Sequence, residues 1–205
     1  KEKEYVMKEL HDGLGTILTS VAVASQAAEK LLDADREKAR ELVGRIGDYS
    51  TEAMDFMRTG LTVLDNPRGE LGPALEWVKL RFSDMLEITG IELRLGYSEE
   101  TAKMKPGAAI VLNLIRIIQE ALTNIMKHAG ATIAGIAIDR KEGGLEVSIT
   151  DDGSGFTPGE KAAGFGLTNI ARRIETMNGV LEITSSTGNG TKLKFTIPHA
   201  GDGKE

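Results

Sequence analysis

The first 65 residues contain no proline and repeat apolar side chains at helical spacing, which restricts this part of the chain to long helices. Two series of apolar residues step by threes and fours, one on each side of the short polar stretch DADREK. Two helices joined by so short a connector form an antiparallel hairpin. The first series is Met7, Leu10, Leu14, Ile17, Val21, Ala24, Ala28 and Leu31, and the second is Leu42, Ile46, Tyr49, Ala53, Phe56 and Gly60.

A two-helix hairpin has one apolar stripe per helix and little core of its own. We therefore expect a homodimer in which two copies pair as a four-helix bundle. The alternative is that the hairpin packs against the remainder of its own chain. The opening stretch KEKEYVMKEL is already in helical pattern and has no initiator Met, so we expect this helix to continue upstream.

The composition is typical of a folded protein, with 40% hydrophobic and 27% charged residues among 205. A net charge of −6 argues against direct binding to nucleic acid. The absence of cysteine excludes disulfides, thiol nucleophiles and cysteine-ligated zinc, and fits a reducing cytoplasm. No uninterrupted apolar run approaches the roughly 18 residues of a membrane helix.

The stretch DNPRGELG marks a linker, after which helices and strands alternate. The predicted domains are 1–65, a linker over 66–72, a second domain over 73–199 and a tail over 200–205. The second domain is predicted to be α+β, a sandwich in which one mixed sheet is covered by helices on one face. Its predicted helices are 71–87, 106–127 and 166–177, and its strands lie in GIELRLGY, TIAGIAID, LEVSITD, VLEITSS and TKLKFTIP.

The helix that ends in QEALTNIMKHA carries a polar stripe. Glu120, Asn124 and Lys127 are four and then three residues apart, so they share one helical face. Any surface helix shows such a stripe opposite an apolar face, so the stripe alone does not assign a function. The apolar face is predicted to consist of Ile110, Leu114, Ile118, Ala121 and Ile125.

Two glycine motifs follow the acid that ends the third predicted strand. In DDGSGF, Asp151 is able to accept a hydrogen bond from an exocyclic amine, and Gly153 and Gly155 would let the backbone approach a flat ligand. In GFGL, Gly164 and Gly166 precede a helix start, where free N–H groups favour phosphate. Asp-Gly pairs are also common in ordinary turns.

A last glycine motif, GNGT, lies between the final two strands and supplies Gly188, Gly190 and the hydroxyl of Thr191. By itself it would be a hairpin turn. The ordered set of four motifs, however, resembles the nucleotide-binding boxes of the GHKL ATPases, the superfamily of gyrase, MutL and the histidine kinases, over residues 70–198.

This resemblance implies a Bergerat-type fold that binds ATP and Mg²⁺. Asn124 would hold the metal, Lys127 and His128 would lie near the phosphates, and Asp151 would bind the adenine amino group. The implied nucleotide-contacting set further includes Gly153, Gly155, Gly164, Gly166, Leu167 and Thr191.

The stretch ELHDGLG, on the predicted hairpin, resembles the phosphoacceptor box of sensor histidine kinases of the NarX/DesK-like branch, where Asp follows His directly. The resemblance implies that His11 is phosphorylated from ATP and passes the phosphoryl group to an Asp of a response regulator, usually one with a helix-turn-helix output. The catalytic set would be His11, Asp12, Glu120 and Lys127. We expect the bare backbone of Gly13 and Gly15 to let the ATP domain approach, and FTPGEKAA to form a mobile lid.

One position departs from this branch, which usually has glutamine five residues after the histidine. Here that position is Thr16, whose short side chain predicts weak phosphatase activity toward the regulator. Two other functions remain open, a GHKL serine kinase of the anti-sigma type and a catalytically silent, ATP-gated dimer module. We expect a cytoplasmic kinase core, with the sensor and any inner-membrane tether upstream of it.

Overall fold

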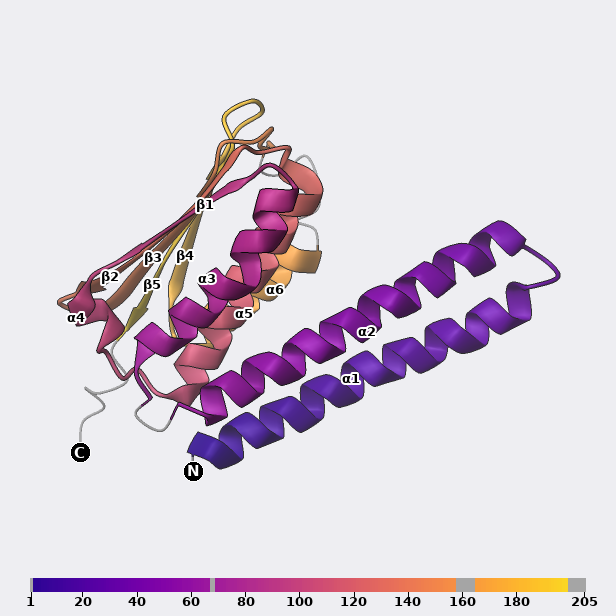
Figure 1. Cartoon of the computed structure of the whole chain (residues 1–205), viewed down its shortest axis with the longest axis horizontal. Helices are drawn as coiled ribbons and strands as arrows, with labels where there is room; N and C mark the ends of the chain where they lie inside the picture. The colour runs from indigo at the N-terminus through magenta and orange to yellow at the C-terminus, as the bar shows by residue number, and fades with distance from the viewer. Residues whose placement is uncertain (1, 67–68, 158–164, 199–205) are drawn as a thin grey trace. The chain divides into compact units, whose positions relative to one another are not determined.

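The computed structural model describes residues 2–66, 69–157 and 165–198 of the chain. It divides into two compact units, Lys1–Asp65 and Asn66–Glu205. The first is a helical hairpin, and the second combines five strands with helices (Figure 1).

The hairpin consists of α1 (Glu2–Leu31) and α2 (Arg36–Leu64), as its two apolar series predicted. Asp35 caps α2, since its carboxylate accepts a hydrogen bond from the Lys38 backbone N–H at 3.0 Å. A side-chain oxygen at this position satisfies an N–H group that the helix itself leaves without a partner.

The apolar face of α1 differs from the predicted one at its first position. Val6 is fully buried whereas Met7 is 56% exposed, so Val6 begins the stripe that continues through Leu10 and Ile17. The prediction of Met7 was wrong because two adjacent residues are both apolar, and only contact with α2 decides between them.

Two glycines in the hairpin lie where a large side chain of the other helix crosses. A Cβ on Gly13 would overlap the Phe56 ring, and a Cβ on Gly60 would overlap the Leu10 side chain. For Gly13 this corrects the expected reason for the glycine, because its bare backbone accommodates Phe56 of α2. Gly15 has no atom within 4 Å of such a Cβ, so its expected role in domain approach stays a prediction.

The second unit contains one mixed sheet in the order β1-β2-β3-β5-β4. β1 and β2 are parallel and the other pairs are antiparallel, which confirms the α+β class. Figure 1 shows α3, α5 and α6 together on one face of this sheet. The elements are α3 (Leu71–Ile88), β1 (Glu92–Tyr97), α4 (Glu99–Ala102), α5 (Ala108–Asn124), η1 (Ile125–Ala129), β2 (Ile133–Lys141), β3 (Gly144–Asp151), α6 (Phe165–Thr176), β4 (Val180–Ser185) and β5 (Thr191–Pro198).

Helix α5 forms the centre of this unit, packed on α3 and α6. It begins at Ala108 instead of Pro106, because Gly107 has a φ of 96°, outside the helical range. With η1 it is long and apolar enough to cross a membrane, but 61% of its most apolar window is buried inside the protein, as in a core helix. Its fully buried side chains include Leu112, Leu114, Ile115, Ile117, Ile118 and Leu122.

The face of the sheet opposite the helices is open and carries a shallow hollow of about 380 Å³. Small residues line most of it, among them Gly96, Gly135, Ala137 and Ser148. None of the described residues that were predicted to bind nucleotide lines this hollow, so the candidate site lies elsewhere.

Candidate nucleotide and phosphoacceptor sites

The polar stripe of α5 continues into a short π-helix, η1. Glu120 and Asn124 on α5 are half-buried, whereas Lys127 and His128 on η1 are exposed. Within the described residues, neither Lys127 nor His128 has a hydrogen-bond or ion-pair partner, which leaves both free for an anionic ligand. A π-turn is uncommon and frequently marks a functional site, and nothing in the α-helical spacing predicted this one.

The first turn of α6 lies directly against this stripe. A Cβ on Gly166 would come within 2.9 Å of Asn124 Nδ2 and still closer to Glu120 Oε1, so any larger residue here would displace these two side chains. Gly166 was predicted to precede the helix, but α6 already begins at Phe165. The N–H groups of a first turn still lack helical partners, so the end of α6 remains suited to phosphate. Leu167 is half-buried in the same turn, and Gly164 lies outside the described residues.

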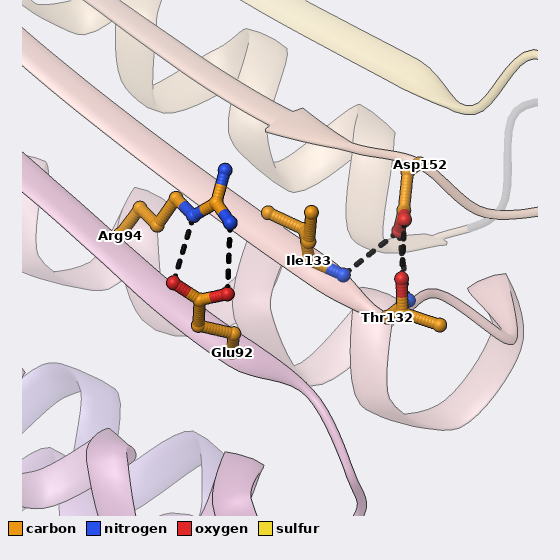
Figure 2. A network of polar contacts seen from close by, with 5 residues as sticks. All are labelled: Glu92, Arg94, Thr132, Ile133 and Asp152. Carbon is orange, nitrogen blue, oxygen red and sulfur yellow. Dashed lines mark hydrogen bonds and ion pairs between the residues drawn. The ribbon is translucent and has the colours of Figure 1, made fainter.

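The two adjacent acids at the end of β3 have different partners. Asp151 is half-buried and accepts one bond, from the Gly153 N–H at 2.9 Å. Asp152 accepts three, from the Thr132 and Ile133 N–H groups at 2.7 and 2.8 Å and from the Thr132 hydroxyl at 2.5 Å (Figure 2). The hydroxyl, followed by the two N–H groups, lowers the pKa of Asp152 to about 2, so this carboxylate is charged at neutral pH.

Gly153 and Gly155 are glycines because of the protein's own backbone. A Cβ on Gly153 would overlap the carbonyl of Ala129, and one on Gly155 would overlap the carbonyl of Ser186. Gly155 also has a φ of 56°, in the left-handed region that favours glycine. The close approach that the structure shows here is between loops of the same chain, and the approach of a flat ligand to Gly153 and Gly155 stays a prediction.

The GNGT motif is hydrogen-bonded to the loop that follows Asp151. The Gly190 N–H donates to the Gly153 carbonyl at 2.8 Å, and the Gly188 N–H donates to the Ser154 carbonyl at 2.7 Å. Thr191 pairs with Asp151 in the β3–β5 register, and its hydroxyl lies 3.3 Å from that of Ser185. The motif is therefore more than a hairpin turn.

The structure thus brings the described parts of the four motifs together at one end of the sheet. The Ser154 N–H donates to the Ala129 carbonyl at 2.7 Å, which ties the loop after β3 to the end of η1. Gly166 joins the start of α6 to the α5 stripe, and Gly190 joins the start of β5 to the loop.

The donor set at this end suits a metal that keeps few protein ligands. No group of three or more His, Asp and Glu side chains occurs in the described part of the chain. The Glu120 carboxylate and the Asn124 amide converge on the space that a side chain at position 166 would fill. Mg²⁺ is usually bound through one or two protein oxygens together with substrate phosphates, so this pair fits it.

In the hairpin, His11 and Asp12 are exposed and lie side by side. His11 Nδ1 is 3.3 Å from Asp12 Oδ1, and the two side chains are 90% and 62% exposed. A carboxylate only accepts, so this contact assigns the ring proton to Nδ1 and leaves Nε2 with its lone pair free. One turn below, the Thr16 hydroxyl donates to the Asp12 backbone carbonyl at 3.1 Å.

Sequence reasoning did not single out Asp152 as a residue of this site. The doubled acid in DDGSGF was its signal, because successive residues at a strand end project to opposite faces. Its partner, Thr132, lies 20 residues earlier, so the contact itself was not visible in the sequence.

Two protein families match the chain in succession. Residues 2–70 match the family described as "Histidine kinase". Residues 110–201 match the family described as "Histidine kinase-, DNA gyrase B-, and HSP90-like ATPase". The first match contains His11 and Asp12, and the second contains all four nucleotide motifs.

Curated relatives extend over both regions. The chain is 31% identical to the sensor histidine kinase YxjM of Bacillus subtilis, over 100% of this chain and 49% of that protein. It is 28% identical to the sensor histidine kinase DesK of the same organism, over 97% of this chain and 51% of DesK. The chain therefore spans about half the length of these relatives.

Solved structures support the fold. The blue-light activated histidine kinase of Erythrobacter litoralis EL346 superposes with a TM-score of 0.64 at 16% identity, over 95% of this chain and 61% of that one. Its isolated histidine kinase domain gives a TM-score of 0.60 at 14% identity, over 92% and 95%. With both family matches in order and sensor kinases aligned along its whole length, this chain belongs to the sensor histidine kinases, in the branch that includes DesK.

Proposed function

We propose that this chain phosphorylates His11 from ATP and then transfers the phosphoryl group to an aspartate of a response regulator. The observation that carries the proposal is the exposed His11–Asp12 pair, with Nδ1 3.3 Å from Oδ1, on a chain that also has an ATP-binding domain. The pair is oriented as a nucleophile and its supporting group would be.

In the proposed step, the lone pair of His11 Nε2 attacks the γ-phosphorus of ATP. A nitrogen–phosphorus bond forms, the bond from phosphorus to the β,γ-bridging oxygen breaks, and ADP leaves with that electron pair. His11 Nδ1 keeps its proton and donates it in a hydrogen bond to Asp12, whose carboxylate stabilises the positive charge that develops on the ring. Because this tautomer keeps its proton on Nδ1, the lone pair of Nε2 is available without a base.

The nucleotide is proposed to bind where the four motifs meet. Asp151 would accept a hydrogen bond from the adenine amine, while Lys127 and His128 would contact the phosphates. Asn124 and Glu120 would hold Mg²⁺, which neutralises triphosphate charge when bound. Glu120 and Lys127 would then position and neutralise the reacting groups, since phosphoryl transfer depends mainly on orientation and electrostatics.

Sensor histidine kinases typically dimerise, and the hairpin has the surface for it. Several large apolar side chains on α1 and α2 are exposed although the faces on which the two helices pack together are already buried. These exposed side chains support a second copy as the partner that covers them. These side chains include Leu18, Val23, Val43, Met54, Met57 and Leu61. The regulator is proposed to have a helix-turn-helix output, as is usual in this branch.

Kinase cores of sensor kinases are cytoplasmic, and we propose the same location for this one. The signal-sensing region, and any membrane tether, would belong to the part of a longer protein that this chain does not include. Such an arrangement fits the finding that the chain spans about half the length of these curated relatives.

One labelling experiment separates the proposed function from the two alternatives. The chain is incubated with Mg²⁺ and γ-labelled ATP, and portions are then treated with acid or with base. A phosphohistidine loses its label in acid and keeps it in base, a phosphoserine behaves in the opposite way, and a silent module takes up no label. Label that survives acid, or no label, would contradict the proposal.

A further inference from the structure

Asp152 joins two backbone segments that border the proposed nucleotide site. Its carboxylate binds the N–H groups of Thr132 and Ile133, just before and at the start of β2, together with the Thr132 hydroxyl (Figure 2). Thr132 follows the end of η1 at Ala129 by three residues. The segment after η1 is thereby held to the loop after β3.

The two segments carry groups on either side of the proposed nucleotide. Lys127 and His128 belong to η1, which precedes Thr132 in the chain. Asp151 directly precedes Asp152. A second bond links the same segments, from the Ser154 N–H to the Ala129 carbonyl at 2.7 Å. Together these contacts fix the backbone on both sides of Gly153 and leave the Asp151 backbone little freedom.

We propose that Asp152 is a positioning residue for adenine recognition, which aims the Asp151 carboxylate at the exocyclic amine by clamping Thr132 and Ile133. The inference rests on the proposed role of Asp151. The Asp152 carboxylate is charged at neutral pH, and both of its oxygens accept hydrogen bonds. These bonds restrict rotation of the side chain more than a single bond would.

Nucleotide selectivity distinguishes positioning from a general effect on stability. Purine riboside triphosphate has the phosphates, sugar and ring system of ATP but lacks the 6-amino group. If Asp152 aims Asp151, its removal weakens binding of ATP and leaves the amine-free nucleotide almost unaffected. A loosened domain would bind both nucleotides less tightly.

The test is a calorimetric titration of the whole chain with each nucleotide in the presence of Mg²⁺. Asp152→Ala is expected to weaken ATP binding about tenfold and to leave purine riboside triphosphate within about twofold of wild type. Asp152→Asn keeps an oxygen for the two N–H donors, so it should restore most of the ATP affinity.

Glu92→Ala is the matched control. Glu92 is another exposed carboxylate in this region, but its side chain binds Arg94 and does not touch Thr132 (Figure 2). Its removal is expected to change the affinity for neither nucleotide.

A double variant supplies the decisive comparison. If Asp152 acts through Asp151, Asp151→Ala alone weakens ATP binding, and adding Asp152→Ala causes no further loss. Additive losses, or equal weakening of both nucleotides by Asp152→Ala, would contradict positioning while leaving the role of Asp151 intact. ATP binding that is unchanged in Asp151→Ala would contradict the adenine assignment itself, and the positioning role with it.

A milder variant keeps the inference testable if Asp152→Ala does not fold. Thr132→Val removes only the hydroxyl bond and keeps both backbone donors. It is expected to weaken ATP binding about threefold with no change for purine riboside triphosphate. Equal effects on the two nucleotides, or none on either, would overturn the proposal.

Discussion

At the scale of single residues, the proposed chemistry depends on adjacent side chains with unequal tasks. His11 is the proposed nucleophile, and its Nδ1 donates a hydrogen bond to Asp12 Oδ1 at 3.3 Å. Asp151 keeps its carboxylate available with one backbone bond, whereas Asp152 is engaged in three. In each pair we propose that one residue contacts the substrate and that its neighbour fixes its orientation.

The bonds to Asp152 predict a loss of stability in acid. Its pKa is about 2 in the folded protein, below the value of about 3.9 expected in the unfolded chain. The stabilisation is therefore complete above about pH 4 and is lost as the pH falls toward 2. Urea unfolding between these pH values should show a smaller loss for Asp152→Asn than for wild type, and identical losses would contradict the clamp.

Thr16 predicts a kinase with weak phosphatase activity. Its hydroxyl already donates to the Asp12 carbonyl at 3.1 Å, and its stem is about two bonds shorter than that of glutamine. An attacking water must lie within about 3–3.5 Å of phosphorus, so this lost reach should matter. Mixing phosphorylated regulator and ADP with the chain should give slow dephosphorylation, accelerated by Thr16→Gln.

The Thr16 hydroxyl could itself hold the water that dephosphorylates the regulator. Thr16→Ala tests it, because this variant removes the hydroxyl and little else. Rapid dephosphorylation by wild type that is lost in Thr16→Ala would show that the argument from reach is wrong.

At the scale of elements, the hairpin helices approach closely at their glycines. Gly13→Ala would force the Phe56 ring to move, so we expect the free energy of unfolding to fall by about 1–3 kcal/mol. Gly15→Ala is the control, since no atom lies within 4 Å of the added methyl group. There the gain in helix propensity should stabilise the protein by up to about 1 kcal/mol.

Urea unfolding followed by circular dichroism measures both variants at equal protein concentration. Destabilisation by Gly15→Ala as large as that by Gly13→Ala would contradict the packing account. If Gly15→Ala is stable but phosphorylates His11 slowly, that result supports the expected role of Gly15 in letting the ATP domain approach.

Most elements of this fold were predictable because their apolar periodicity is strong and local. The two long helices, α3 and all five strands follow from spacing that a short window contains. Pairwise contacts between distant segments were not predictable in this way. Phe56 lies 43 residues after Gly13, and nothing near ELHDGLG indicates that the ring needs room there. The π-turn at η1 likewise leaves no signal in the helical spacing of the sequence.

The site was predictable as a set of motifs but not as a set of contacts. The order of the motifs identified Asn124, Asp151 and Gly166, and Gly166 does lie against Asn124. The sequence did not indicate why the chain itself needs glycine at 153 and 155, because the carbonyls of Ala129 and Ser186 that approach them come from other parts of the chain.

At the scale of the whole molecule, the exposed apolar side chains of the hairpin predict a dimer. Replacing Val43 and Met54 by Glu should convert particles of about twice the 22.0 kDa chain mass to monomers, measured by light scattering. Leu80→Glu is the control, because Leu80 is also apolar, is 75% exposed and belongs to α3. A wild-type monomer, or dissociation by Leu80→Glu alone, would contradict dimerisation through the hairpin.

Labelling of His11→Gln with γ-labelled ATP determines whether His11 receives the phosphoryl group. Glutamine at an exposed position should leave the fold and nucleotide binding intact, so the account predicts complete loss of label with unchanged ATP affinity. His128→Gln, in the nucleotide site, should still take up label, at a reduced rate. Label retained by His11→Gln at the wild-type stoichiometry would contradict the account.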